Sequence, residues 1–149
     1  MYKQPFTSKN QHEAEALVIF CMDFRFHGQT KKFIENFLRI KSYDVVALAG
    51  ASKNFSDPDR GDDKEVAMKH VRLSVDLHKV KKVILIDHAD CGAYGGRKAF
   101  AGDPVKEREA HEANLAKAVE VINNEFSSVE VETYYAELVD DDKMVEFMK

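Results

Sequence analysis

The chain has 149 residues, which is the length of one domain with an ordinary hydrophobic core. Its composition, 44% hydrophobic and 32% charged, is that of a soluble globular protein. The net charge of −4 gives no electrostatic reason to expect nucleic acid or an anionic membrane as a partner. The longest uninterrupted apolar run, residues 16–22, is far too short to span a bilayer, and the first residues lack the apolar segment of a secretory signal.

The N-terminal third predicts an arm, two strands and one helix. Residues 1–15 are polar, and we expect them to form an arm. The apolar run at residues 16–20 predicts a buried strand, and residues 44–48, which are apolar after Asp44, predict a second one. Gly28 is expected to interrupt the chain before a helix over residues 30–39, which has an apolar face.

The middle of the chain predicts a long loop, a helix and a third strand. Residues 53–63 are rich in Asp, Ser, Asn and Gly, which predicts a loop long enough to act as a functional flap. Asp62 and Glu65 have the spacing of a capping box that opens a helix over residues 63–78. The apolar run at residues 83–86 predicts the third strand, over residues 82–87.

The last third predicts a long helix followed by two strands. Asp103 as the N-cap and Pro104 at the first helical position begin the helix. Its apolar stripe is expected to face the core and comprises Leu115, Ala118, Val119, Ile122 and Phe126. Residues 129–138 begin with alternating apolar and charged side chains, which predicts a strand with one face in water, and residues 144–147 predict a short last strand.

The order of these elements predicts an α/β fold with a mainly parallel four-stranded sheet and helices on both of its faces. Right-handed crossovers leave few strand orders, and we expect 2-1-3-4. The switch point then lies between the first and third strands, at their carboxyl ends, which is where open α/β sheets place their ligands. No linker or repeat divides residues 1–149, so we expect a single domain with residues 1–15 as its N-terminal arm.

The only two cysteines follow these two strands. Cys21 comes directly after the first strand, and His88 and Cys91 follow the third. Taken singly, a Cys at the end of a strand is usually a small buried hydrophobic residue, and the two could also form a redox pair. Two thiolates and one imidazole together make a donor set suited to zinc, and three protein ligands leave a fourth position for water, a carboxylate or substrate. The sequence therefore predicts a zinc site of the catalytic type.

Asp23 and Arg25 are candidates for a role beside the metal. Two positions apart in an extended loop, their side chains would emerge on the same side, and the guanidinium would hold the carboxylate in a bidentate fork. Such a carboxylate could orient a zinc-bound hydroxide, or take the fourth zinc position if the pair breaks. The alternative is a solvated surface ion pair of little energetic value. Asp87 or Asp90 could accept the second ring proton of a histidine ligand.

We assign no role to the remaining histidines, which are His12, His27, His70, His78 and His111. Phe24 and Phe26 alternate with the two charged residues and are expected to face an apolar surface. Since two distant cysteines do not make a secreted disulfide framework, a reducing cytoplasmic location is expected.

The pairing of C-x-D-x-R at residues 21–25 with H-x-x-C-G at residues 88–92 resembles the β-class carbonic anhydrases. The resemblance implies zinc-dependent, reversible hydration of carbon dioxide to bicarbonate by a zinc-bound hydroxide. It implies zinc ligation by Cys21, His88 and Cys91, with Asp23 as dyad member or fourth ligand and Arg25 as its partner. It also implies an antiparallel edge strand and a homodimer or dimer of dimers. Gly50 lies in an Ala-Gly loop like the one whose backbone amides approach the substrate in that family.

Several positions depart from the family pattern and leave alternative functions open. Phe24 stands where Ser is usual, Ala47 and Leu48 stand where Arg-Asn is common, and the loop at residues 53–63 lengthens the interval between the motifs. These changes affect the surroundings of the substrate more than the metal ligands. The alternatives are a non-catalytic zinc-binding protein and a hydrolase for carbon disulfide or carbonyl sulfide on the same scaffold.

Overall fold

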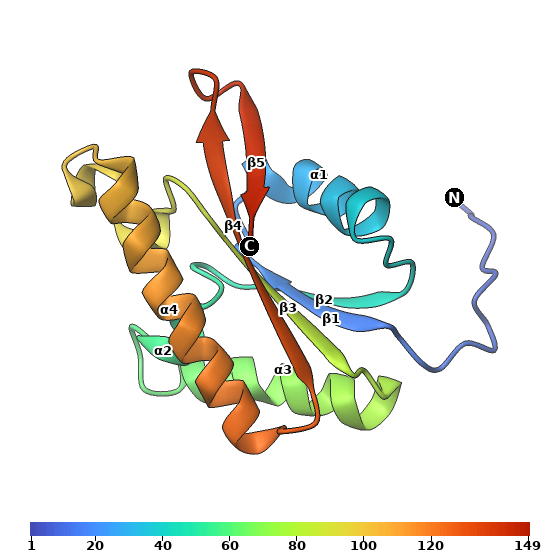
Figure 1. Ribbon diagram of the computed structural model, residues 1–149. Coiled ribbons are helices and arrows are strands. Elements are labelled where there is room, and N and C mark those ends of the chain that lie inside the picture. Colours follow the sequence, from blue (N-terminus) through green and yellow to red (C-terminus); the bar gives the residue numbers. More distant parts are fainter.

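A five-stranded sheet in the order β2-β1-β3-β4-β5 forms the centre of the protein, described here by a computed structural model of residues 1–149 (Figure 1). Its strands are β1 (Ala16–Phe20), β2 (Tyr43–Ala47), β3 (Lys82–His88), β4 (Glu130–Val139) and β5 (Met144–Met148). The first four are parallel to their neighbours, and β5 pairs antiparallel with β4 at the edge. The α/β class, the order 2-1-3-4 and the short antiparallel edge strand are confirmed.

Helices cover both faces of the sheet, as predicted. They are α1 (Phe24–Lys32), α2 (Lys53–Ser56), α3 (Asp63–His78) and α4 (Pro104–Glu125), with a π-helical turn at Phe33–Phe37 and 3-10 turns at Gly92–Tyr94 and Arg97–Phe100. In Figure 1, α1 lies on one side of the sheet, while α3 and α4 lie on the other. No helix is both long and apolar enough to cross a lipid bilayer.

The central strand β1 buries side chains on both faces of the sheet. Leu17 and Ile19 belong to the core under α3 and α4, whereas Ala16 and Val18 belong to the core under α1. Because both faces are covered, β1 reads as an uninterrupted apolar run instead of an alternating one. Its carboxyl end points into the loops that carry the predicted site.

The first helix begins earlier than predicted, and this changes the geometry of the first motif. Asp23 is the N-cap of α1, and its side chain accepts a hydrogen bond from the backbone N–H of Arg25. The predicted extended loop at this point is therefore wrong, and Gly28 lies inside the helix. An Asp at an N-cap satisfies one of the free N–H groups of the first turn, and burial of Phe26 outweighs the cost of about 1 kcal/mol for an interior glycine.

The helical course of the motif also separates the two phenylalanines. Phe26 packs in the core with 4% of its surface exposed, whereas Phe24 on the opposite side of the helix is 82% exposed. The prediction that both face one apolar surface is wrong, because positions two apart in a helix point in different directions.

The predicted N-terminal cap is present in α4 and absent in α3. Asp103 caps α4 by accepting hydrogen bonds from Val105 and Lys106, with Pro104 at the first helical position, as predicted. The bounds of α3 are also as predicted, but Asp62 makes no side-chain capping bond. The predicted capping box is wrong, because Glu65 instead pairs with Arg72, about two turns further along the helix.

Two smaller predictions required correction. The predicted loop at residues 53–63 contains the short helix α2, which buries Phe55 in the core. In β4, the consecutive residues Tyr134, Tyr135 and Ala136 are all buried, so the second half of this strand is covered on both faces. The alternation seen at the start of the strand does not continue because α4 lies against one face and the Phe33–Phe37 turn against the other.

Candidate metal centre

The structure brings Cys21, His88 and Cys91 together at the carboxyl ends of β1 and β3. These strands are parallel neighbours, with Phe20 paired to Ile86, so the residues that follow them emerge at the same edge of the sheet. The donor atoms of the three side chains lie within 4.8 Å of one another, and the two sulfurs are 3.8 Å apart. All three side chains are buried. Sequence reasoning thus identified a cluster that the fold forms.

The orientation of His88 leaves one ring nitrogen without a protein partner. Nδ1 lies 2.8 Å from the carbonyl oxygen of Ala89, which can only accept, so Nδ1 carries the proton. Nε2 is buried and has no hydrogen-bond partner. The prediction that Asp87 or Asp90 accepts the ring proton is wrong, since a backbone carbonyl does so. A buried imidazole nitrogen with a free lone pair, close to two sulfurs, is the arrangement that a metal ligand requires.

The proximity of the two cysteines favours a state in which one of them is a thiolate and the other a thiol. The hydrogen bond from Cys91 lowers the pKa of the Cys21 thiol to about 4, with further help from His88 and the backbone N–H of Gly50, although burial acts in the opposite direction. The adjacent Cys21 thiolate, together with burial, raises the pKa of Cys91. Burial alone would lower the pKa of His88, but the neighbouring thiolate raises it. Negative charge is thus concentrated where a cation would bind.

Gly50 contributes to this site through its backbone. Its N–H lies 3.5 Å from the sulfur of Cys21, and its φ angle is +72°. A Cβ at this position would lie 2.8 Å from the Cβ of Ala93, so no other residue fits without displacing the second loop. The loop after β2 therefore packs directly on the loop after Cys91. The substrate-binding role of Gly50 remains a prediction.

Asp23 and Arg25 form the predicted pair. Arg25 Nε lies 3.0 Å from both carboxylate oxygens of Asp23, and Nη2 lies 2.6 Å from Oδ2. This fork lowers the pKa of Asp23 to about 2, so the carboxylate is an acceptor at neutral pH. Asp23 is outside the group of three donor atoms, because its oxygens are held by Arg25. Its role as a fourth ligand remains a prediction.

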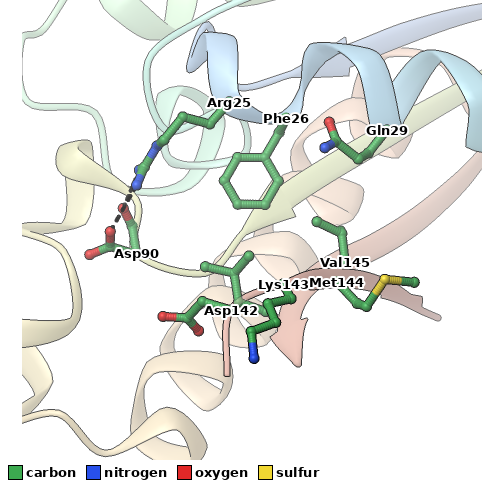
Figure 2. A pocket seen from close by; sticks show the side chains of 9 residues that line it. Arg25, Phe26, Gln29, Asp90, Asp142, Lys143, Met144 and Val145 are labelled. Atoms are coloured by element: carbon green, nitrogen blue, oxygen red, sulfur yellow. Dashed lines mark hydrogen bonds and ion pairs between the residues drawn. The ribbon is translucent and has the colours of Figure 1, made fainter. Parts of the chain in front are cut away.

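Two cavities flank the guanidinium of Arg25. One, of about 430 Å³, lies between α1 and the β4–β5 hairpin, and Figure 2 shows Arg25 and Asp90 at one side of it and Met144 and Val145 at the other. The second, of about 540 Å³, has no hydrophobic lining residue. It is lined by Asp23, Arg25, Asp90, Gly92, Gly95, Gly96 and Lys98. The polar cavity gives solvent access to the Asp23 side of the site.

Sequence reasoning missed a buried polar network behind the centre. Asp87 accepts hydrogen bonds from the backbone and hydroxyl of Ser52 and from the hydroxyl of Tyr94, and it is paired with His111 on α4. Glu107, one turn before His111, is also buried. A signal was present in the sequence, since both lie at helical spacing from the predicted apolar stripe of α4 and therefore share its buried face.

Comparisons with known proteins agree with this description. A family model described as "Putative carbonic anhydrase" matches residues 11–148. Uncharacterized proteins of Rickettsia bellii and Rickettsia conorii are 32% and 31% identical over 130 and 131 residues, which is 85% of this chain and 78% and 69% of theirs.

Two solved structures share the fold. A carbonic anhydrase of Streptococcus mutans matches with a TM-score of 0.57 and 15% identity, over 93% of this chain and 84% of that one. A β-carbonic anhydrase of Trichomonas vaginalis matches with a TM-score of 0.59 and 12% identity, over 97% and 86% of the two chains. Identities this low establish the fold alone. Together with the family match, they confirm the resemblance found in the motifs, and the chain belongs to the "Putative carbonic anhydrase" family as a divergent β-carbonic-anhydrase-like protein.

Proposed function

We propose that the protein is a zinc-dependent carbonic anhydrase that interconverts carbon dioxide and bicarbonate. The observation that carries the proposal is the buried cluster of Cys21, His88 and Cys91, in which His88 Nε2 has no protein partner. This cluster lies in a fold shared with solved carbonic anhydrases, at the strand ends where such folds bind ligands.

The donor set fits zinc. Two sulfurs and one imidazole nitrogen are soft and borderline ligands, which select zinc over magnesium or calcium. A fully buried nitrogen lone pair without a partner costs free energy unless something occupies it, which supports a bound cation. Held by Cys21, His88 and Cys91, zinc supplies a Lewis acid that lowers the pKa of water toward about 7.

Asp23, held in place by Arg25, can orient the oxygen that attacks carbon dioxide. Because its pKa is about 2, Asp23 is ionised throughout the neutral range and can only accept hydrogen bonds. Arg25 fixes the plane of that carboxylate with three contacts, two from Nε to the two oxygens and one from Nη2 to Oδ2. The remaining acceptor capacity of Asp23 can accept a hydrogen bond from the attacking water or hydroxide and so direct its lone pair toward carbon dioxide.

The same proposal extends to assembly and location. Met22 and Phe24, on either side of Asp23 in the sequence, are exposed apolar side chains beside the site, and this supports a homodimer or dimer of dimers that covers them. The two free cysteines are both used by the proposed metal centre, which supports a reducing, cytoplasmic location. The small-molecule substrate requires no nucleic acid or membrane partner.

Elemental analysis and a stopped-flow hydration assay on one preparation test the proposal. We expect one zinc per chain and a hydration rate above buffer at mildly alkaline pH. Cys91→Ser should lose both metal and activity, whereas Asp23→Asn should keep the metal and lose about 10- to 100-fold in rate. A zinc-loaded protein without hydration activity would refute the proposal. Hydrogen sulfide release from carbon disulfide or carbonyl sulfide would then indicate a hydrolase, and no activity at all would indicate a zinc-binding protein without catalysis.

A further inference from the structure

Asp90 connects Arg25 to the interior of the protein through four hydrogen bonds. Its carboxylate accepts from Arg25 Nη1 at 3.0 Å and from the backbone N–H of Arg97 at 3.2 Å, and its carbonyl accepts from Arg25 Nη2 at 3.1 Å. Its own N–H donates to Glu107 Oε1 at 2.7 Å. The φ angle of Asp90 is +54°, a left-handed conformation that turns the carbonyl and the carboxylate toward the same guanidinium.

The guanidinium of Arg25 is therefore used on two edges. The edge formed by Nε and Nη2 faces Asp23. The edge formed by Nη1 and Nη2 faces Asp90, and Figure 2 shows the guanidinium directed at that residue. A planar cation held on both edges cannot rotate about its own axis without breaking contacts on each side. The position of the Asp23 carboxylate therefore depends on the hydrogen bonds that Asp90 accepts from Arg25.

Glu107 supplies the buried end of this connection. Its side chain is 1% exposed, its Oε1 accepts the hydrogen bond from Asp90, and its Oε2 has no hydrogen-bond partner. The nearest cationic atom, Arg97 Nε, is 4.0 Å away. Burying a carboxylate with so few partners is unfavourable. No step of the proposed reaction uses Glu107, so its contribution must come from the backbone group that it holds.

We propose that Asp90 and Glu107 are positioning residues that form a tether holding Arg25 against Asp23. The structural claim stands on the contacts above, and only its effect on rate rests on the proposed function. An exposed ion pair alone would contribute little, and the side chains of Arg25 and Asp90 are 45% and 38% exposed. What distinguishes this pair is that the Asp90 backbone is fixed to a buried residue of α4, so the acceptor is already in place when Arg25 docks.

The Nε–H of Arg25 provides a reporter that the tether does not touch. This group donates to Asp23 and not to Asp90, so any change in it after mutation of Asp90 is transmitted through the guanidinium. Its exchange with solvent can be followed by nitrogen-15 NMR on the full chain with its metal bound. In Asp90→Ala we expect exchange to accelerate about tenfold, because the guanidinium loses a carboxylate partner and becomes mobile.

Variants of Glu107 and a matched control complete the test. Glu107→Ala should accelerate the exchange as Asp90→Ala does, whereas Glu107→Gln keeps an oxygen acceptor for Asp90 N–H and should restore the slow exchange. Asp142→Asn removes an exposed carboxylate that pairs with Arg97 and should leave the exchange unchanged. If Glu107→Ala does not fold, Asp90→Ala decides the result. Equal acceleration in Glu107→Gln would overturn the role of Glu107.

The outcome separates this inference from the proposed function. Unchanged Nε–H exchange in Asp90→Ala would overturn the tether, whatever the enzymatic activity. Accelerated exchange in a protein that does not hydrate carbon dioxide would support the tether and refute only the proposed function. If the protein is active, Asp90→Ala should lower kcat at unchanged zinc content, with the same rank order among the variants as the exchange rates.

Discussion

Nδ1 of His111 lies 2.9 Å from a carboxylate oxygen of Asp87, and both side chains are excluded from solvent. Asp87 is the residue before the candidate ligand His88, and it also receives hydrogen bonds from Ser52 and Tyr94. One carboxylate therefore joins α4 to the loop after β2 and to the loop after Cys91. The shape of the candidate metal centre depends on this buried junction as well as on Cys21, His88 and Cys91 themselves.

Replacing His111 with Leu should destabilise the protein by about 3 kcal/mol, because it leaves the buried Asp87 carboxylate without its imidazole partner. Urea unfolding monitored by circular dichroism measures the difference. His12→Leu, a change in the exposed N-terminal arm, is the control and should have little effect. Equal stability of the two variants would mean that the Asp87–His111 contact contributes nothing.

Removal of the metal should lower thermal stability. The proposed ligands come from the ends of β1 and β3, so a bound ion links the two central strands, and at 100 times its dissociation constant a ligand adds about 2.7 kcal/mol. For a chain of this size we expect Tm to fall by about 5–10 °C after treatment with a chelator. Cys91→Ser serves as the control, since its Tm should not respond to chelator or added zinc. A chelator-independent wild-type Tm would argue against a tightly bound ion.

Arg25→Lys should reduce hydration activity about 10- to 100-fold while zinc content stays at one per chain. A lysine ammonium is a point charge and cannot contact Asp23 and Asp90 along two edges of a plane, as the guanidinium does. Stopped-flow kinetics and elemental analysis on the same sample give both quantities. Lys31→Arg, an exposed position later in α1, is a suitable control. Full activity in Arg25→Lys would show that charge alone suffices.

Replacing two different glycines with alanine should change the free energy of unfolding in opposite directions. Gly50→Ala places a methyl group 2.8 Å from Ala93 at a φ angle of +72°, and we expect a loss of about 1–3 kcal/mol together with weaker metal binding. Gly28→Ala lies inside α1 with open space around it and should stabilise the protein by about 0.5–1 kcal/mol. Urea unfolding of both variants checks this. A stabilised Gly50→Ala would contradict the close packing of the two loops.

The stability contribution of Glu132 should depend on pH. Burial alone would raise its pKa, but hydrogen bonds from Lys82 and Tyr134 outweigh it and lower the pKa to about 2. Since the folded pKa is below the unfolded value of about 4.3, the contribution is complete above pH 4.3 and is lost as the pH falls toward 2. Glu132→Gln should therefore be less stable than wild type by about 1 kcal/mol at pH 7 and no less stable near pH 2. Glu120→Gln, at an exposed position of α4, should show no such dependence.

The sheet and the convergence of Cys21, His88 and Cys91 were predictable because both follow from sequence patterns that contacts between distant residues reinforce. The runs at residues 16–20 and 83–86 place apolar side chains on both faces, as a parallel sheet covered by helices requires. Right-handed crossovers then make those strands neighbours, and neighbouring parallel strands bring Cys21 and His88 to one edge.

The local course of the first motif was not predictable in the same way. Asp23 suits an extended loop and a helix N-cap equally, and the choice depends on Phe26, which is buried only if the helix begins there. The contact between Asp90 and Glu107 was missed because it joins residues 17 positions apart through a backbone N–H, which leaves no trace in a residue pattern. His111 could have been found from its spacing to Leu115 and Ile122 on the buried face of α4.

The separation of 3.8 Å between the sulfurs of Cys21 and Cys91 also governs how the protein has to be handled. Without a metal, a thiolate beside a thiol is readily oxidised, and oxidation would consume both sulfur ligands at once. A preparation exposed to air could therefore keep its fold and lose its capacity for zinc. Thiol quantification alongside the metal assay would distinguish such an oxidised sample from a protein that never bound the ion.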